Sequence, residues 1–202
     1  MTRGLLLVVS GPSGCGKGTI LKEVLAQNRN LFYSVSATTR APRPGEVEGE
    51  SYFFLTTSAF EELIASGGML EHACYCGHYY GTPKAAVDQQ LSEGKDVILE
   101  IEVQGAMQVK RSCPDAVFLF VLPPSMRELS RRLYKRGTET EAVIQGRLEA
   151  AEREIGYARE YDYIIVNAGL EDAIADFHAV VRAEKLAAGH SAEQIEAVLA
   201  TR

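Results

Sequence analysis

The chain has 202 residues, 46% hydrophobic and 24% charged, so it can bury a core and is not expected to be disordered. Its formal net charge is -6, whereas proteins that bind nucleic-acid polymers usually carry a basic excess. We find no signal peptide, and no apolar stretch is long enough for a transmembrane helix. Four cysteines are few for this length. We therefore expect reduced thiols, a cytoplasmic location and no membrane or nucleic-acid partner.

Short apolar runs and helical patterns alternate along most of the chain. Residues 5–10 predict a strand buried on both faces, and a helical pattern begins at Gly18. Further strands are predicted at residues 97–101, 117–122 and 163–166, and helices at residues 84–93 and 170–186. Strands that alternate with helices favour an α/β core with a parallel sheet.

Two segments interrupt this alternation. Residues 37–81 are rich in Gly, Pro, Thr and aromatic residues, with an extended piece at 51–55, and predict a smaller mixed lobe. Residues 125–159 are highly charged and helical, which predicts an exposed helical hairpin rather than core.

The ends of the predicted helices give further detail. Gly137 is typical of a helix end, and Thr138 and Glu141 have the spacing of a capping box that would start the second helix of the hairpin. After Gly189 we expect one more amphipathic helix, which would serve packing or weak self-association.

Residues 11–19 read GPSGCGKGT between a predicted strand and a predicted helix, the context that a P-loop requires. Glycines let backbone N–H groups turn toward phosphate oxygens, the helix N-terminus adds positive charge, and Lys17 can reach the β- and γ-phosphates. Gly18 stands where Ser or Thr usually follows the lysine. The missing hydroxyl after the lysine disfavours an ordinary GTPase or ATPase. The hydroxyl of Thr19, displaced by one residue, is only a weak candidate for a magnesium ligand. The predicted ATP-binding residues of the loop are Gly11, Pro12, Ser13, Gly14, Cys15, Gly16, Lys17, Gly18 and Thr19.

Two other interpretations of this loop stay open. The glycines could form a turn that binds no ligand. Cys15 is interpreted as a small residue in a tight loop, with a redox-sensitive phosphate loop as the alternative.

Arg40 and Arg43 lie three residues apart on a chain stiffened by Pro42 and Pro44. Guanidinium groups bind phosphate oxygens in a bidentate manner, so this pair predicts a clamp for a phosphorylated acceptor. Because surface arginines are common, the pair alone is also compatible with an exposed loop.

The pattern Ser36-x-Thr38-Thr39-Arg40-x-Pro42-Arg43-x-Gly45-Glu46-x-x-Gly49-x-x-Tyr52 resembles the GMP-binding signature of guanylate kinases. The resemblance covers roughly residues 4–186 in order. It continues in Glu71, Gly77-x-Tyr79-Tyr80-Gly81-Thr82, Glu100-Ile101-x-x-Gln104-Gly105, Pro123-Pro124-Ser125, Arg136-Gly137-Thr138-Glu139-Thr140, Arg147-Leu148 and Ile165-Val166-Asn167.

This resemblance implies reversible phosphoryl transfer from ATP to GMP, giving ADP and GDP in purine nucleotide metabolism, with Mg²⁺ accompanying ATP and dGMP as a further acceptor. It implies a P-loop parallel-sheet core (residues 1–36, 83–124 and 160–202), an inserted mixed α/β GMP-binding lobe (37–82) and a helical lid (125–159). The oligomeric state, monomer or homo-oligomer, is left open.

The resemblance also assigns roles to particular residues. The implied catalytic residues are Lys17, Arg43, Arg136 and Arg147. Arg132, Arg136 and Asn167 would join the loop in binding ATP. The implied GMP-binding residues are Ser36, Arg40, Arg43, Tyr52, Glu71, Tyr80, Thr82 and Glu100.

Chemistry supports guanine as the base. A carboxylate such as Glu71 can accept hydrogen bonds from both N1–H and the N2 amino group of guanine. Adenine offers no such pair, and leaving a buried acceptor unpaired costs about 1–3 kcal/mol, more for a charge. Glu100 is the expected metal residue, touching either a water molecule on Mg²⁺ or the ribose and phosphate region of GMP. The family often has Asp at the position of Glu102, whose longer side chain disfavours direct coordination.

His72, Cys74, Cys76 and His78 alternate like zinc ligands. On a flat strand the first and last would lie roughly 20 Å apart, too far to share one ion, so no metal site is expected there.

Three rival functions are weighed against the kinase. A non-catalytic guanylate-kinase-like module would tend to have a degraded phosphate loop, and a sugar-phosphate kinase would not need residues that recognise guanine. A GTPase switch would need an Asn-Lys-x-Asp motif, which the chain lacks.

Overall fold

The computed structural model describes residues 3–135 and 140–201, and the chain forms two compact units. The first unit is made of Arg3–Val8 and Leu31–Ala116, the second of Val9–Asn30 and Val117–Arg202. The division of the sequence into core, GMP-binding lobe and lid stays a prediction.

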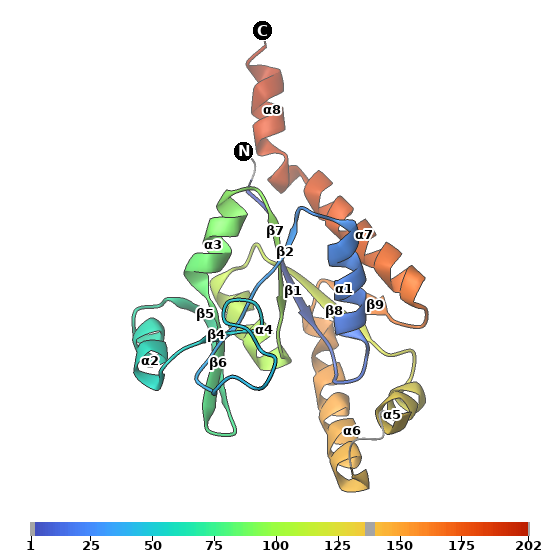
Figure 1. Ribbon diagram of the computed structural model, residues 1–202. Coiled ribbons are helices and arrows are strands. Elements are labelled where there is room, and N and C mark those ends of the chain that lie inside the picture. Colours follow the sequence, from blue (N-terminus) through green and yellow to red (C-terminus); the bar gives the residue numbers. More distant parts are fainter. Residues whose placement is uncertain (1–2, 136–139, 202) are drawn as a thin grey trace. The chain divides into compact units, whose positions relative to one another are not determined.

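A five-stranded sheet has the strand order β2-β7-β1-β8-β9 (Figure 1). The β2–β7 and β8–β9 pairs are both parallel, which confirms the predicted α/β fold with a parallel sheet. Its central strands are rich in Val, Leu, Ile and Phe and are almost fully buried, as expected for strands covered on both faces. The strands are β1 (Leu6–Ser10), β2 (Leu31–Tyr33), β7 (Asp96–Glu100), β8 (Val117–Leu122) and β9 (Tyr163–Val166).

In the second unit, α1 (Lys17–Gln27) packs against α7 (Leu170–Leu186). Both helices bury residues three or four positions apart, for example Ile20 and Val24 in α1 and Phe177 and Val181 in α7. The predicted start of α1 and the predicted bounds of α7 agree with the structure to within one residue.

The charged segment forms α5 (Met126–Lys135), α6 (Glu141–Gly156) and the short η1 (Tyr157–Glu160). The prediction of an exposed hairpin rather than core is wrong for the apolar side of its two helices. Leu129 and Leu133 of α5 pack in one buried cluster with Ile144 and Ala151 of α6, because each helix keeps an apolar stripe beneath its charges.

The predicted helix break and capping box cannot be followed, since Gly137 and Thr138 lie outside the described residues. The N-cap residue of α6 is Thr140, and its side chain makes no capping hydrogen bond.

The first unit carries a second, mixed sheet with the order β4-β3-β6-β5. The β3–β4 pair is parallel, whereas β3–β6 and β5–β6 are antiparallel. The elements are β3 (Ala37–Thr38), β4 (Phe53–Phe54), α2 (Thr57–Ala65), β5 (Met69–Tyr75) and β6 (His78–Pro83), followed along the chain by α3 (Lys84–Ser92) and α4 (Val103–Ser112).

A tight hairpin turn joins β5 to β6, with Tyr75 paired to His78. Cys76 and Gly77 both have positive φ, 50° and 78°, as a type I′ turn requires. The flat strand considered for His72–His78 is therefore wrong, because the chain folds back at Cys76. Within residues 3–135 and 140–201, no three His, Cys, Asp or Glu side chains are grouped to hold a metal ion.

The C-terminal segment forms the short η2 (Ala188–His190) and α8 (Ala192–Leu199), as predicted. Ile195, Val198 and Leu199 are 50%, 73% and 55% exposed, so this helix face is not packed in the structure. None of the helices in the described parts of the chain has the length and apolar character needed to cross a membrane.

Candidate functional site

The loop between β1 and α1 has the strand–loop–helix form predicted from its sequence. Gly11, Gly14 and Gly16 have φ values of 150°, 90° and 98°. A Cβ on Gly16 would lie 2.3 Å from Asn167 Nδ2, so a side chain is excluded there by both backbone conformation and space. The glycines thus give the loop a shape in which backbone N–H groups can line a concave anion site.

Lys17 is the first residue of α1, at the positive end of that helix. Its Nζ donates to the carbonyl of Gly11 and, at 3.4 Å, to that of Pro12. The ammonium group is therefore held over the loop. Thr19, the weak metal candidate, is exposed in the first turn of the helix.

Two residues predicted to bind ATP contact the backbone of the same loop. Asn167 Nδ2 donates to Cys15 O at 2.8 Å, and Arg132 Nη1 donates to that oxygen at 3.1 Å. Arg132 Nη2 also donates to Asn167 O at 3.0 Å. Both side chains thus support the loop from α5 and from the end of β9.

Glu128 holds Arg132 in place, since its Oε1 accepts from Arg132 Nε at 2.9 Å. Glu128 also accepts two hydrogen bonds from Arg131, and together the guanidinium groups lower the pKa of Glu128 to about 2. The carboxylate is therefore ionised at neutral pH and orients both arginines.

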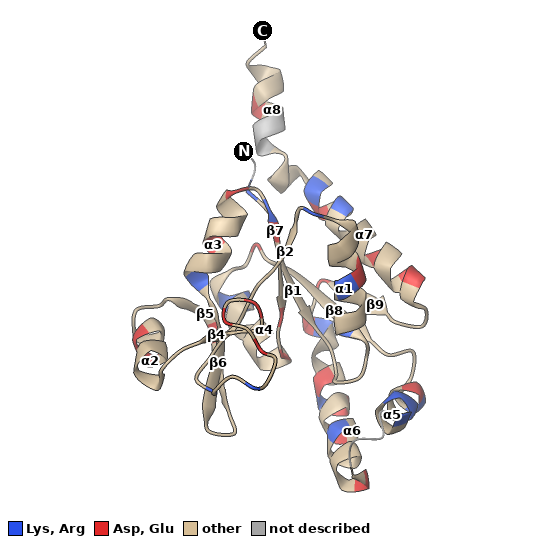
Figure 2. Ribbon diagram, viewed as in Figure 1, with Lys and Arg blue, Asp and Glu red and all other residues tan. Residues whose placement is uncertain are grey.

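Figure 2 shows basic residues on α5 and α6. Both helices belong to the same unit as the loop. Arg147 Nη1 of α6 donates to Ser13 Oγ at 3.2 Å, which brings one predicted catalytic arginine to the loop. The predicted catalytic residue Arg136 lies outside the described residues.

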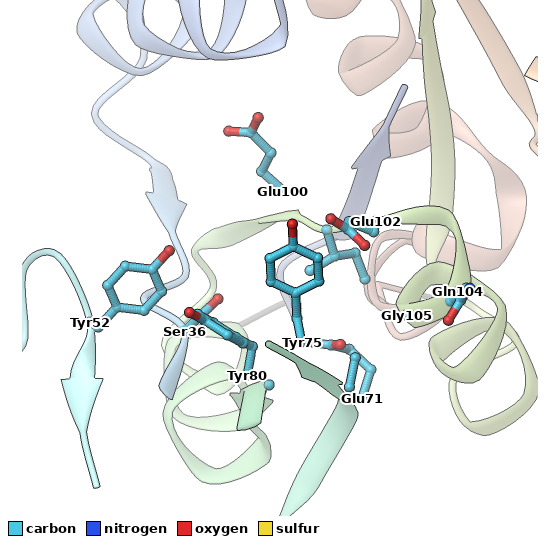
Figure 3. A pocket seen from close by; sticks show the side chains of 12 residues that line it. Ser36, Tyr52, Glu71, Tyr75, Tyr80, Glu100, Glu102, Gln104 and Gly105 are labelled. Atoms are coloured by element: carbon cyan, nitrogen blue, oxygen red, sulfur yellow. The ribbon is translucent and has the colours of Figure 1, made fainter. Parts of the chain in front are cut away.

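A pocket of about 330 Å³ lies in the first unit. Its walls come from the mixed sheet and from the segment that follows β7 (Figure 3). Five residues predicted to bind GMP line it, namely Ser36, Tyr52, Glu71, Tyr80 and Glu100.

Sequence reasoning missed most of the other lining residues as site residues. They are Ala73, Tyr75, Gly81, Ile101, Glu102, Gln104 and Gly105, of which only Glu102 had been considered, as a metal ligand. Those after β7 carried a usable signal, because ligands bind beyond the carboxyl ends of strands in parallel sheets. Tyr75 carried none, since it reaches the pocket only through the β5–β6 hairpin.

Glu71 is a buried carboxylate in the pocket wall, 7% exposed. Its Oε1 accepts from Thr82 Oγ1 at 2.7 Å, and these two residues are paired between β5 and β6. Burial raises the pKa of Glu71 and the charge of Glu102 raises it further, whereas the hydrogen bonds from Thr82 lower it. Thr82 itself does not line the pocket, so it acts on Glu71 from behind.

Gly105 of α4 makes room for this carboxylate. A Cβ there would lie 2.7 Å from Glu71 Oε2. Any larger residue would displace the carboxylate group from its place in the wall.

Neither Arg40 nor Arg43 lines the pocket, although both were predicted to bind GMP. Arg40 makes a bidentate pair with Glu46, at 2.9 and 2.8 Å, and lies 5.4 Å from the centre of the Tyr52 ring. The Arg43 backbone N–H donates to Glu46 Oε2 at 2.7 Å. These hydrogen bonds, with that of Arg40 first, lower the pKa of Glu46. Glu46 therefore organises the arginine loop, while Tyr52 connects it to the pocket.

Glu100 ends β7 at the pocket, where its Oε2 accepts from Tyr33 OH at 3.1 Å. Burial, followed by the charge of Glu100, raises the pKa of Tyr33. The tyrosine is thus a hydrogen-bond donor throughout the neutral range, and it fixes one carboxylate oxygen.

Comparisons with known proteins agree on one family. The family model for guanylate kinase matches residues 3–184. A guanylate kinase of Thermus thermophilus is 54% identical over 98% of this chain and 89% of its own length. One of Desulfitobacterium hafniense is 54% identical over 90% of this chain and 91% of its own. The crystal structure of guanylate kinase from Anaplasma phagocytophilum has a TM-score of 0.73 at 33% identity, over 93% of this chain and 89% of that one.

Proposed function

Because the chain belongs to the guanylate kinase family, whose members transfer a phosphoryl group from ATP to GMP, we propose that its two sites each bind one of these substrates. The P-loop with its arginines binds ATP, and the pocket walled by Glu71 binds GMP. The observation that carries the second assignment is a buried carboxylate, held by Thr82 and given room by Gly105, in the wall of a pocket.

Glu71 would recognise guanine. The hydrogen bond from Thr82 uses one lone pair of Oε1, which leaves the other carboxylate lone pairs free to accept from N1–H and the N2 amino group of guanine. Ser36 lines the same pocket and offers a hydroxyl to the base edge. A base without the paired donors would leave the carboxylate desolvated and unpaired, so guanine is favoured. Because these contacts concern the base, dGMP is proposed as an acceptor too.

Tyr52, Tyr80, Arg40 and Arg43 would hold the phosphate of GMP. The two tyrosines line the pocket and contact each other edge to face, with ring centres 6.1 Å apart. Arg40 lies over Tyr52 but is paired with Glu46, so a phosphate would share this guanidinium with the carboxylate. The hydrogen bonds described between Arg43 and Glu46 use the backbone N–H and carbonyl of Arg43, which suits a role for its side chain in catalysis.

On the ATP side, Lys17 would neutralise the β- and γ-phosphates, while Arg132 and Asn167 keep the loop in shape. Arg147 would stabilise the transferring phosphoryl group, as would Arg136. No general base is needed, since the phosphate of GMP is already anionic.

Magnesium would accompany ATP, with Glu100 touching it through water. The described residues hold no cluster of acidic ligands, and Glu100 presents a carboxylate already bound by Tyr33. This donor set fits an ion that is held chiefly by nucleotide phosphates and water. When bound, Mg²⁺ offsets the negative charge of the phosphates.

A coupled assay of ADP release tests these assignments, with ATP, Mg²⁺ and each of GMP, dGMP, AMP, CMP and UMP. We expect turnover with GMP and dGMP only. Lys17→Ala should lose turnover yet keep the rise in melting temperature that GMP produces, because the lysine belongs to the ATP site. Glu71→Gln should raise KM for GMP and leave KM for ATP unchanged. If either variant weakened the binding of GMP and of ATP equally, this would contradict the assignment of the two substrates to separate sites.

A further inference from the structure

We propose that Gln108 is a positioning residue that fixes Glu71 for guanine recognition, an inference that rests on the proposed role of Glu71. Gln108 lies in α4, and its side-chain amide forms two hydrogen bonds with the backbone of His72, the residue after Glu71. His72 N–H donates to Gln108 Oε1 at 3.1 Å, and Gln108 Nε2 donates to His72 O at 2.9 Å.

This pair of bonds matters because β5 is an edge strand, next to β6 alone in the mixed sheet. The backbone groups on the outer side of an edge strand have no neighbouring strand to pair with. The carboxamide of Gln108 supplies one donor and one acceptor, as a strand would, and so ties β5 to α4 at a single residue.

The backbone before Glu71 is irregular, which makes such a tie useful. Met69 pairs with Pro83 and Glu71 with Thr82, so β5 has one extra residue, Leu70, against β6. Bulges re-aim side chains, and here Leu70 and Glu71 are both buried although they are consecutive. The direction of Glu71 therefore depends on where the chain is held just after the bulge, at His72.

The same helix shapes the pocket. Gln104 and Gly105 of α4 line it, and Gln108 lies one turn further along. Gly105 leaves room for the Glu71 carboxylate, while Gln108 anchors the backbone of His72, the residue after Glu71. Gln108 does not line the pocket, so its effect on the substrate is indirect, and Glu71, next to the anchored His72, is the residue through which we expect it to act.

Gln108→Leu removes both bonds at similar side-chain size. We expect KM for GMP to rise about tenfold, with kcat changed less than about twofold and KM for ATP unchanged, because a displacement near 1 Å weakens recognition without touching the transferred group. Gln108→Asn keeps the carboxamide but is one methylene shorter, so it should have an intermediate effect. Gln89→Leu on α3, the same change at an exposed glutamine, is the control and should leave KM for GMP unaltered.

A double-mutant cycle separates positioning from a general loss of structure. If Gln108 acts through Glu71, Gln108→Leu should raise KM for GMP much less in a Glu71→Gln background than in the native chain. Additive effects, or an equal rise in KM for ATP, would overturn the proposal. If Glu71→Gln alone raises KM for GMP and neither Gln108 variant does, the inference fails while the role of Glu71 stands. If Glu71→Gln has no effect, the proposed recognition of guanine fails first.

Discussion

At the scale of single residues, the carboxyl group of Glu71 couples the pocket to pH. Burial raises its pKa above the ordinary 4.5, so the folded chain binds a proton there more readily than the unfolded chain does. This residue's contribution to stability without ligand therefore improves as pH falls through the raised value and worsens as pH rises.

Binding of GMP should show the opposite trend, because only the carboxylate accepts both guanine donors. We expect KM for GMP to rise as pH falls through the raised pKa of Glu71, and this rise to be lost in Glu71→Gln. Steady-state kinetics at saturating ATP across the acidic range would measure it. The phosphate of GMP titrates equally in both proteins, so an identical pH profile in the variant would exclude Glu71 as the cause.

Cys76 is a residue in an unfavourable backbone conformation. It has a φ of 50° in the β5–β6 turn, a value that residues with a Cβ other than Asn and Asp seldom adopt. We expect Cys76→Asn to raise the free energy of unfolding by about 0.5–1 kcal/mol, as measured by urea denaturation. Cys74→Asn, within β5, is the control and should bring no gain. Equal effects of the two changes would argue against a strained turn.

At the scale of elements, a change at Gly105 of α4 should favour the helix but disturb the recognition of GMP. Gly105 lies inside the helix, where alanine would add up to about 1 kcal/mol of helix propensity. Its Cβ would nevertheless approach Glu71 Oε2 to 2.7 Å. Because that atom ends a side chain that can turn, we expect Gly105→Ala to keep the melting temperature and to raise KM for GMP about tenfold.

Gly146→Ala in α6 is the matched control. A Cβ at Gly146 meets no atom within 4 Å, so this variant should gain helix propensity without any change in KM for GMP. A Gly105→Ala protein with native KM would mean that Glu71 does not need its present position.

At the scale of the whole molecule, the C-terminal helix carries little of the stability. Its described apolar side chains, Ile195, Val198 and Leu199, remain at least half exposed. Removal of residues 191–202 should change the free energy of unfolding by less than about 0.5 kcal/mol and leave kcat and both KM values unchanged. Urea denaturation and the coupled assay measure this. A larger loss that depends on protein concentration would instead indicate that α8 joins two copies of the chain.

The sequence by itself determined the parts that depend on neighbours along the chain. The P-loop followed from glycines, Lys17 and flanking strand and helix patterns within residues 5–27, and the parallel sheet from short apolar runs between helices. Glu71 could be named because the family pattern places it, and its carboxylate suits guanine.

Only the tertiary structure decided which distant segments meet. Tyr75 reaches the pocket because Cys76 and Gly77 turn the hairpin, and Gly105 is needed because Glu71 points at it from another element. Arg132 and Asn167, whose binding of ATP stays a prediction, hold the carbonyl of Cys15 from more than a hundred residues away along the chain. Such contacts leave no local pattern, since they arise from packing between elements, and packing is fixed only once the whole fold has formed.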